Sequence, residues 1–375
     1  MLSSLIIFGT RPEAIKMAPL VKAFKSQPEI FNTKVCITAQ HREMLDQVLD
    51  FFEIIPDYDL NLMKPNQNLY SLTADIITEL KPVLEDFKPD YVYVHGDTTT
   101  TMAASIAAFY SGAKVCHIEA GLRTFNKFSP FPEEINRSIT GRVSDLHFAP
   151  TETSRANLLK ENIHPDQILV TGNTVIDALN YSVKKVTSPA FEDKEVNTLK
   201  EIIEPDKQLI LVTGHRRENH GEGFINICNA LKEIAKSSLN YQIIYPVHLN
   251  PNVQKPVYEL LKGLDNVHLI APLSYPAFVW LMNESKLIIT DSGGVQEEAP
   301  SLGKPVLVMR NTTERPEAVK AGTVKLVGTD KNKIIAEALN LMKNKEQYEK
   351  MCKLHNPYGD GKACERIVDF IKKLQ

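Results

Sequence analysis

The sequence predicts an α/β protein with two Rossmann-like, doubly wound domains that face a central cleft. Two observations predict this fold class. Short β-branched runs alternate with amphipathic stretches almost from end to end, and the alternation starts again after a more polar stretch near the middle of the chain. Apolar runs bounded by turn residues are typical of strands buried on both faces of a parallel sheet. The 375 residues, 43% of them apolar, suffice for two such domains.

The first half of the chain carries six predicted strands with helices between them. The strands are expected at 5–8, 34–37, 91–94, 114–118, 146–148 and 168–170. Between them, apolar residues repeat at helical spacing, for example over 15–25 and 42–52. This βαβ order predicts a parallel sheet covered by helices.

The second half repeats the pattern after the polar stretch 183–208, in which Pro189 and Pro205 interrupt regular structure. Five more strands are expected, at 209–212, 242–245, 267–270, 287–289 and 306–308. A last helix is expected over 363–374, after a turn at 356–359. The domain boundary is therefore expected between 170 and 185.

Composition excludes several classes of protein. The net charge of −3 provides no basic field for nucleic acid or an anionic membrane. The five cysteines include no CxxC pair, which argues against a disulfide framework or a zinc knuckle. No apolar run approaches the ~20 residues of a membrane span, and no signal sequence is recognisable. We expect a cytoplasmic protein.

Candidate site residues of the first domain follow its strands, where loops and helix N-termini converge in a parallel sheet. Gly9 permits a tight turn, and Arg11 and Lys16 place two cations near a helix start, which predicts an anion site. The spacing is neither a Walker loop nor GxGxxG.

Three carboxylates, Asp97, Glu119 and Glu133, lie near later strand ends of this domain. Acids that converge there would shift one another's pKa values, as general acids and bases require. The structural alternatives are that Asp97 caps a helix starting near Thr98 and that Glu133 only supports a helix N-terminus.

The second domain offers groups suited to a nucleotide. His215 follows the first strand beside two arginines. The glycines of the Ser292-Gly293-Gly294 turn would let backbone N–H groups approach a diphosphate, and Glu298 would accept hydrogen bonds from a ribose. Arg315, before another expected helix, adds a cation. A simple glycine-rich turn is the alternative for the 292–294 segment.

Metal chemistry is not predicted, because the histidines are scattered and neither HxH nor HExxH occurs. Gln40, His41 and His248 lie at other strand ends. Phe278, Trp280 and Leu281 stand at helical spacing, which favours core packing. No cofactor is expected, since GxGxxG is absent.

Taken together, eight ordered segments resemble the non-hydrolysing UDP-N-acetylglucosamine 2-epimerases. The resemblance covers residues 9 to about 361, and its segments are GTRPEAIKMAP, TAQHREMLDQ, HGDTTTT, HIEAGLRT, PFPEEINR, GHRREN, DSGGVQEEAPSLGKPV and TTERPEAV. It implies the glycosyltransferase-B architecture, with a C-terminal helix that returns to the first domain. The domains would then be 1–172 with about 358–375, and 173–357. It also implies a cytoplasmic homodimer that makes UDP-N-acetylmannosamine for surface polysaccharides.

The resemblance also implies roles for single residues. The residues that would bind UDP are Arg11, His215, Ser292, Gly293, Gly294, Glu298 and Arg315. Phe278 is a further candidate for UDP binding. Those that would carry or support the chemistry are Asp97, Glu119, Glu133, His215 and Lys16. An activating second site in some bacterial members matches Gln40, His41, Gln67, Arg216 and His248. Asn66 stands where those members have an arginine, which puts this regulation in doubt.

The chemistry itself suggests elimination. The hydrogen at C2 of the N-acetylhexosamine is not α to a carbonyl. Without a redox cofactor, the economical route is loss of UDP to give 2-acetamidoglucal, followed by re-addition of UDP. Four alternatives stay open: an epimerase of a UDP-2,3-diacetamido sugar, a hydrolysing epimerase, a retaining glycosyltransferase, and a non-catalytic nucleotide-sugar sensor.

Overall fold

A computed structural model of the chain describes residues 1–39, 42–64 and 67–374. The chain divides into two compact units, the first made of Met1–Asn180 with Tyr358–Gln375 and the second of Tyr181–Pro357. Helix α7 (Thr174–Val186) carries the chain from the first unit into the second. The chain returns to the first unit after Pro357.

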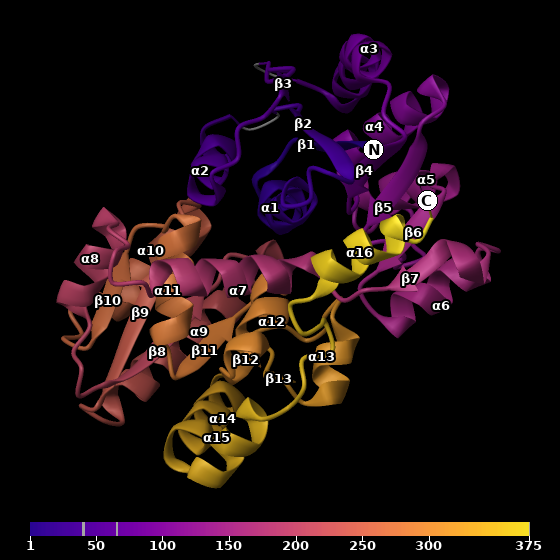
Figure 1. The fold of residues 1–375 in the computed structure, drawn as a ribbon. Helices are drawn as coiled ribbons and strands as arrows, with labels where there is room; N and C mark the ends of the chain where they lie inside the picture. The colour runs from indigo at the N-terminus through magenta and orange to yellow at the C-terminus, as the bar shows by residue number, and fades with distance from the viewer. Residues whose placement is uncertain (40–41, 65–66, 375) are drawn as a thin grey trace. The chain divides into compact units, whose positions relative to one another are not determined.

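The first unit is built on a seven-stranded parallel sheet in the order β3-β2-β1-β4-β5-β6-β7 (Figure 1). Its strands are β1 (Leu2–Phe8), β2 (Phe31–Ile37), β3 (Tyr58–Asp59), β4 (Tyr91–His95), β5 (Lys114–Ile118), β6 (Leu146–Ala149) and β7 (Ile168–Val170). Strand β4 is buried throughout and β5 is buried after Lys114, which explains why both appear in the sequence as continuous apolar runs.

Helices pack against this sheet in two groups. The helices α3, α4 and α5 pack side by side, whereas α1 packs against α2 and α16. The bounds are α1 (Arg11–Lys25), α2 (Arg42–Phe52), α3 (Leu69–Phe87), α4 (Thr99–Ser111), α5 (Glu133–Val143), α6 (Glu152–Lys160) and α16 (Ala363–Lys372). Asp177 of α7 accepts hydrogen bonds from the backbone N–H groups of Ala363 (3.2 Å) and Cys364 (2.9 Å). This capping attaches the C-terminal helix to the first unit.

The second unit has a six-stranded parallel sheet in the order β10-β9-β8-β11-β12-β13. Its strands are β8 (Gln208–Thr213), β9 (Tyr241–Pro246), β10 (Val267–Ile270), β11 (Leu287–Thr290), β12 (Val306–Val308) and β13 (Val324–Leu326). Its helices are α8 (Lys194–Ile202), α9 (Glu222–Lys236), α10 (Pro251–Leu261), α11 (Tyr275–Glu284), α12 (Gly293–Glu298), α13 (Pro316–Ala321), α14 (Lys331–Lys343) and α15 (Lys345–Cys352). Helix α9 packs against α10 and α14, and α8 packs against α11.

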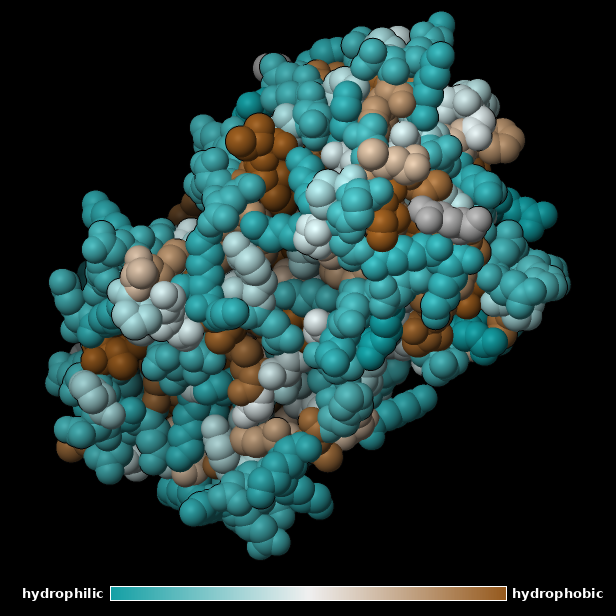
Figure 2. Space-filling view, viewed as in Figure 1, coloured by the Kyte–Doolittle hydropathy of each residue, from teal (hydrophilic) through white to brown (hydrophobic). Residues whose placement is uncertain are grey.

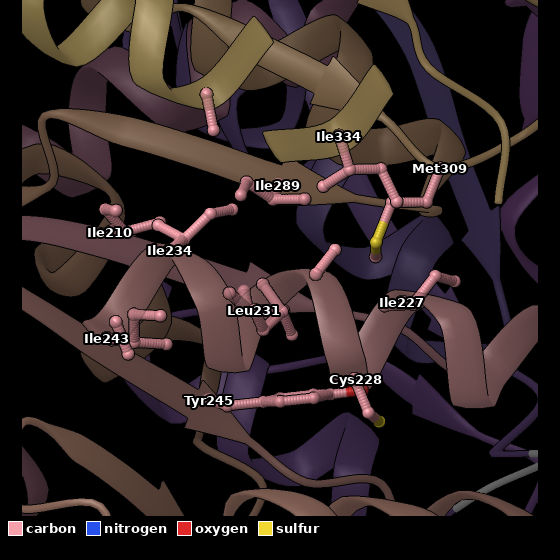
Figure 3. Close-up of a cluster of buried hydrophobic side chains, with 14 of the residues drawn as sticks. Ile210, Ile227, Cys228, Leu231, Ile234, Ile243, Tyr245, Ile289, Met309 and Ile334 are labelled. Atoms are coloured by element: carbon pink, nitrogen blue, oxygen red, sulfur yellow. The ribbon is translucent and has the colours of Figure 1, made fainter. Parts of the chain in front are cut away.

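The main core of the second unit lies between α9 and the sheet. Figure 3 shows Ile227, Leu231 and Ile234 of α9 among strand residues that include Ile210 and Ile289. The three α9 residues recur at i, i+4 and i+7, so they occupy one face of the helix. All five are fully buried. Burial of each such side chain contributes roughly 1.5–3 kcal/mol.

Three elements differ from the sequence prediction. The two-residue strand β3 and the edge strand β13 were not predicted, because neither contains a long apolar run. Helix α8 lies within the stretch 183–208, where Pro189 and Pro205 fall in the connections on either side of it. Only two α8 residues, Val196 and Leu199, are buried, so its apolar signal is weak.

The surface is mainly hydrophilic in the view of Figure 2, and its apolar side chains form small separate patches. Among the described residues, no helix combines the length and the hydropathy needed to cross a membrane.

Candidate functional site

Each sheet has a point where the connections of two neighbouring strands diverge, between β1 and β4 in the first unit and between β8 and β11 in the second. Ligands of doubly wound folds bind beyond the strand ends at such points. Arg11 and Asp97 follow β1 and β4, and His215 and Ser292 follow β8 and β11. The structure thus places predicted site residues at the switch point of each unit.

The turn between β1 and α1 is tightly packed. A Cβ atom on Gly9 would lie 1.9 Å from Oγ1 of Thr38 and 2.6 Å from Oγ1 of Thr100, so only glycine fits. The buried carboxylate of Glu13 accepts hydrogen bonds from the backbone N–H groups of Gly9 (3.0 Å) and Thr10 (2.8 Å). This capping box starts α1 at Arg11, which fixes the position of Lys16.

Glu13 also links this turn to the next strand end. Its other oxygen accepts hydrogen bonds from the hydroxyl groups of Thr98 (2.6 Å) and Thr101 (3.0 Å) at the start of α4. Sequence reasoning missed Glu13, although the capping-box spacing from Thr10 was a usable signal.

Glu119 is the centre of the candidate site in the first unit. It follows β5 with a left-handed φ of 62°, an uncommon conformation for a residue other than glycine. Its carboxylate forms an ion pair with Lys16 and accepts a hydrogen bond from Nδ2 of Asn173 (2.7 Å). Nε2 of His95 lies 3.6 Å from the same oxygen.

These neighbours determine the charge of Glu119. Burial alone would raise the pKa of this carboxyl, but the nearby Lys16 cation and then His95 outweigh burial and hold the pKa well below its usual range. Glu119 is therefore ionised at neutral pH.

Asp97 shows the opposite behaviour. Burial raises its pKa; the Arg137 cation counteracts this, and the charges of Glu119 and Glu133 add to the rise. Its carboxylate accepts a hydrogen bond from Nη2 of Arg137 (2.7 Å), and its backbone carbonyl accepts one from Nδ2 of Asn136 (3.0 Å). An acid with a raised pKa close to two other carboxylates is suited to proton transfer.

The two structural alternatives for the acids have different outcomes. The hypothesis that Asp97 caps α4 is wrong, because the hydroxyl of Thr98 accepts the capping hydrogen bond from the Thr101 N–H (3.0 Å). Glu133 is the first residue of α5, yet its Oε2 is buried without a hydrogen-bond partner in the described part of the chain. Glu133 therefore has unused capacity to bind a ligand or a proton.

Arg137 is a second residue that sequence reasoning missed. One turn after Glu133 on α5, it pairs with Asp97 and, at 3.2 Å, with Glu134. Glu134 in turn accepts hydrogen bonds from the backbone N–H groups of Thr124 (3.0 Å) and Phe125 (2.8 Å). The i, i+3 spacing of Glu134 and Arg137 within PFPEEINR was the available signal.

The candidate site in the second unit is organised by Asp291, which is fully buried at the end of β11. Its Oδ2 accepts hydrogen bonds from the backbone N–H groups of His215 and Arg216, both at 2.9 Å. Its Oδ1 lies 3.7 Å from Nδ1 of His215. Asp291 was not singled out from the sequence, because its partners lie 75 and 76 residues away.

His215 is 44% exposed, and its ring stacks on that of His248 with a centroid distance of 5.1 Å. Burial lowers its pKa; Asp291 acts in the opposite direction, and His248 and Arg216 lower it further. His215 is therefore neutral at neutral pH without a ligand and would gain a proton beside an anion.

Two guanidinium groups approach the glycine turn after β11. A Cβ atom on Gly293 would lie 3.8 Å from Nη2 of Arg315 and 3.9 Å from Nη2 of Arg216. Arg315 is held by an ion pair with the buried Glu297. Ser292 is the N-cap of α12 but makes no side-chain capping bond. Cations and backbone N–H groups gathered in this way are suited to a diphosphate.

The other site residues predicted from the sequence do not all lie beside the glycine turn. Oε1 of Glu298 lies 3.3 Å from the position of a Cβ on Gly294, beside the same turn. Phe278 is half-buried, whereas Trp280 and Leu281 are buried. Gln67 lines a cavity of about 1250 Å³ in the first unit. Gln40, His41 and Asn66 lie outside the described residues.

Across residues 1–39, 42–64 and 67–374, no group of three or more His, Cys, Asp or Glu side chains is arranged to hold a metal ion.

The profile of the UDP-N-acetylglucosamine 2-epimerase family matches residues 22–372. The chain is 60% identical over 368 residues to the UDP-N-acetylglucosamine 2-epimerase of Escherichia coli strain K12, with 98% of each chain covered. Its fold is similar to a crystal structure of the Neisseria meningitidis UDP-GlcNAc 2-epimerase bound to UDP-GlcNAc (TM-score 0.89, 56% identity, 99% of this chain and 100% of that one). It is also similar to the Methanocaldococcus jannaschii enzyme in complex with UDP-GlcNAc and UDP (TM-score 0.79, 34% identity, all of both chains).

Proposed function

Because the chain belongs to the UDP-N-acetylglucosamine 2-epimerase family, we propose that it reversibly converts UDP-N-acetylglucosamine into UDP-N-acetylmannosamine without releasing free sugar. The relatives from N. meningitidis and M. jannaschii bind UDP-GlcNAc, which supports a UDP-sugar as the substrate.

The observation that carries the proposal is the opposite pKa behaviour of two neighbouring acids. Asp97 has a raised pKa and Glu119 a lowered one. Neighbouring acids with separated pKa values are typical of sites that move protons. A sensor that only binds a nucleotide would not need a third acid, Glu133, with a buried oxygen left for a partner.

Elimination and re-addition use these groups as follows. A base removes the C2 proton, the electron pair of the C2–H bond forms the C1=C2 double bond, and UDP leaves with the electron pair of the C1–O bond. A proton then reaches C2 from the opposite face while a UDP oxygen attacks C1. Asp97 and Glu133 are the proposed proton-transfer residues, in either order. Each contributes ~10²–10⁴-fold in rate, and Glu119 with Lys16 positions and polarises the sugar.

The charge on the departing UDP would be stabilised by residues of the second unit. The proposed diphosphate ligands there are Arg315, His215 and the backbone N–H groups at Ser292, Gly293 and Gly294. Arg11 is a further proposed UDP ligand. Glu298 would bind the ribose, and Phe278 would contact the nucleotide.

We also propose a regulatory second site. Arg216 and His248 adjoin His215, so a second UDP-sugar bound there would border the first. Gln67, Gln40 and His41 are further proposed contacts of the activating ligand.

Assembly and cellular role also rest on the family resemblance. We propose a cytoplasmic homodimer that supplies UDP-N-acetylmannosamine for polysaccharide synthesis. The aromatic pair Phe109 (62% exposed) and Tyr110 (74% exposed) on α4 supports burial against another chain. Analytical ultracentrifugation would detect the dimer.

The central test is to incubate the protein with UDP-N-acetylglucosamine in D₂O and follow the reaction by ¹H and ³¹P NMR. We expect deuterium at C2, a mixture of both UDP-sugars and a trace of UDP. Conversion without deuterium at C2 would contradict elimination.

Related incubations separate the alternatives. Free N-acetylmannosamine as the main product would indicate a hydrolysing epimerase. Transfer of the sugar to an added acceptor would indicate a glycosyltransferase. Reaction only with a UDP-2,3-diacetamido sugar would change the substrate, and binding without turnover would indicate a sensor.

A further inference from the structure

The chain returns to the first unit through the turn Asn356–Gly361, to which the proposed function assigns no role. On one side, Nδ2 of Asn356 donates hydrogen bonds to the carbonyl of Glu297 (2.7 Å) and to the hydroxyl of Ser301 (2.6 Å) within the second unit. Two residues later, the carbonyl of Tyr358 accepts a hydrogen bond from the N–H of Asn173 (2.7 Å) within the first unit. The turn is therefore anchored by hydrogen bonds on both sides of the unit boundary.

At this boundary two chain segments of the first unit pass in close contact. A Cβ on Gly172 would lie 3.2 Å from the Cα of Gly359, and a Cβ on Gly359 would lie 3.2 Å from the Cα of Gly172. Both glycines have left-handed φ values, 86° and 125°. Their lack of side chains lets the backbone of Asn173 reach Tyr358.

Asn173, 3% exposed, uses both ends of its side-chain amide. Its Oδ1 accepts a hydrogen bond from the N–H of Val175 (3.0 Å) at the start of α7. Its Nδ2 donates to Oε2 of Glu119 (2.7 Å), the same oxygen that pairs with Lys16. Because an ionised carboxylate only accepts hydrogen bonds, the amide has one consistent orientation.

Glu119 depends on such support, because its φ of 62° is rarely adopted by residues with a side chain. A conformation of this kind persists only where the surroundings hold it. Lys16 provides charge through a long side chain, whereas Asn173 provides a short, buried donor fixed by its own backbone.

We propose that Asn173 is a positioning residue for Glu119, which it holds from the point where the returning chain crosses the start of α7. The inference rests on the proposed function in one respect, namely that Glu119 serves the epimerisation. The contact itself can be tested without turnover.

Two variants separate positioning from helix capping. Asn173→Ser and Asn173→Asp both keep an acceptor for the Val175 N–H, since serine and aspartate are good N-caps. The serine variant loses the donor to Glu119, and the aspartate variant places a carboxylate against it.

For Asn173→Ser we expect kcat to fall roughly 10- to 100-fold, with KM changed less than about threefold, since misplacement of a group by ~1 Å can cost that much in rate. For Asn173→Asp we expect a larger fall in kcat than for Asn173→Ser, because its carboxylate repels the ionised carboxylate of Glu119. The matched controls are Asn344→Ser and Asn344→Asp at the exposed N-cap of α15, which should leave both quantities unchanged.

Melting temperatures test the contact independently of the reaction. Aspartate at an N-cap is normally as stabilising as serine, so a lower melting temperature for Asn173→Asp than for Asn173→Ser at pH 7 would reveal repulsion by Glu119. This difference should vanish when both changes are made in a Glu119→Gln background.

Wild-type kcat in Asn173→Ser, or a melting difference that survives Glu119→Gln, would overturn the inference. A wild-type protein that fails to epimerise UDP-N-acetylglucosamine would instead refute the proposed function, and the melting comparison would still decide whether Asn173 holds Glu119.

Discussion

Acidification should destabilise the first unit through His117, a buried residue of β5. Its side chain is 1% exposed, and Nε2 lies 2.7 Å from the carbonyl oxygen of Gly96. A carbonyl only accepts, so Nε2 carries the proton of a neutral ring. Burial, reinforced by repulsion from His147, lowers the pKa of His117 from its ordinary 6.5 to about 3.

Proton linkage gives the direction in which the folding stability changes with pH. The unfolded chain binds a proton at this histidine below about pH 6.5 while the folded chain does not, so stability falls as the pH drops from 6.5 towards 3. Each pH unit in this window costs about 1.4 kcal/mol. Between pH 7 and pH 5, His117 therefore removes about 2 kcal/mol of stability.

The assay is urea unfolding at pH 7 and pH 5, followed by far-ultraviolet circular dichroism. The sole tryptophan, Trp280, belongs to the second unit, so its fluorescence reports that unit separately. The variant His117→Gln, which keeps a donor for Gly96 but cannot titrate, should lose about 2 kcal/mol less than the wild type over this range. His164→Gln, at a ring 69% exposed, is the control. An equal loss of unfolding free energy between pH 7 and pH 5 in the wild type and in His117→Gln would refute the reasoning.

Three further changes test the candidate site in each unit and the β1–α1 turn. Arg315→Leu should weaken UDP binding about 10- to 100-fold by removing charged hydrogen bonds, and unchanged affinity by calorimetry would exclude Arg315 from the diphosphate site. Lys16→Met leaves the buried Glu119 without its cation, so we expect a loss of roughly 3–5 kcal/mol in urea unfolding that Glu119→Gln partly restores. Absence of this rescue would show that the pair is not coupled. Gly9→Ala should cost at least about 1–3 kcal/mol through overlap with Thr38, and wild-type stability would contradict the packing.

Local sequence pattern determined the fold class and most of the strands. The run at 91–94 and the run at 209–212 are buried on both faces of their sheets, so their apolar composition alone reveals them. The edge strand β3 escaped prediction because it contributes only Tyr58 and Asp59, whose pairing with β2 depends on backbone groups.

The sequence also predicted that the candidate site residues lie at strand ends, because those residues immediately follow apolar runs. What only the tertiary structure decided is how each residue is held. Asp97 pairs with Arg137, 40 residues away, and Glu119 with Asn173, 54 residues away. Asp291 supports the His215 loop from 76 residues away. Such partners and the resulting pKa shifts depend on burial and on distances across the sheet, which the spacing of residues along a chain does not encode.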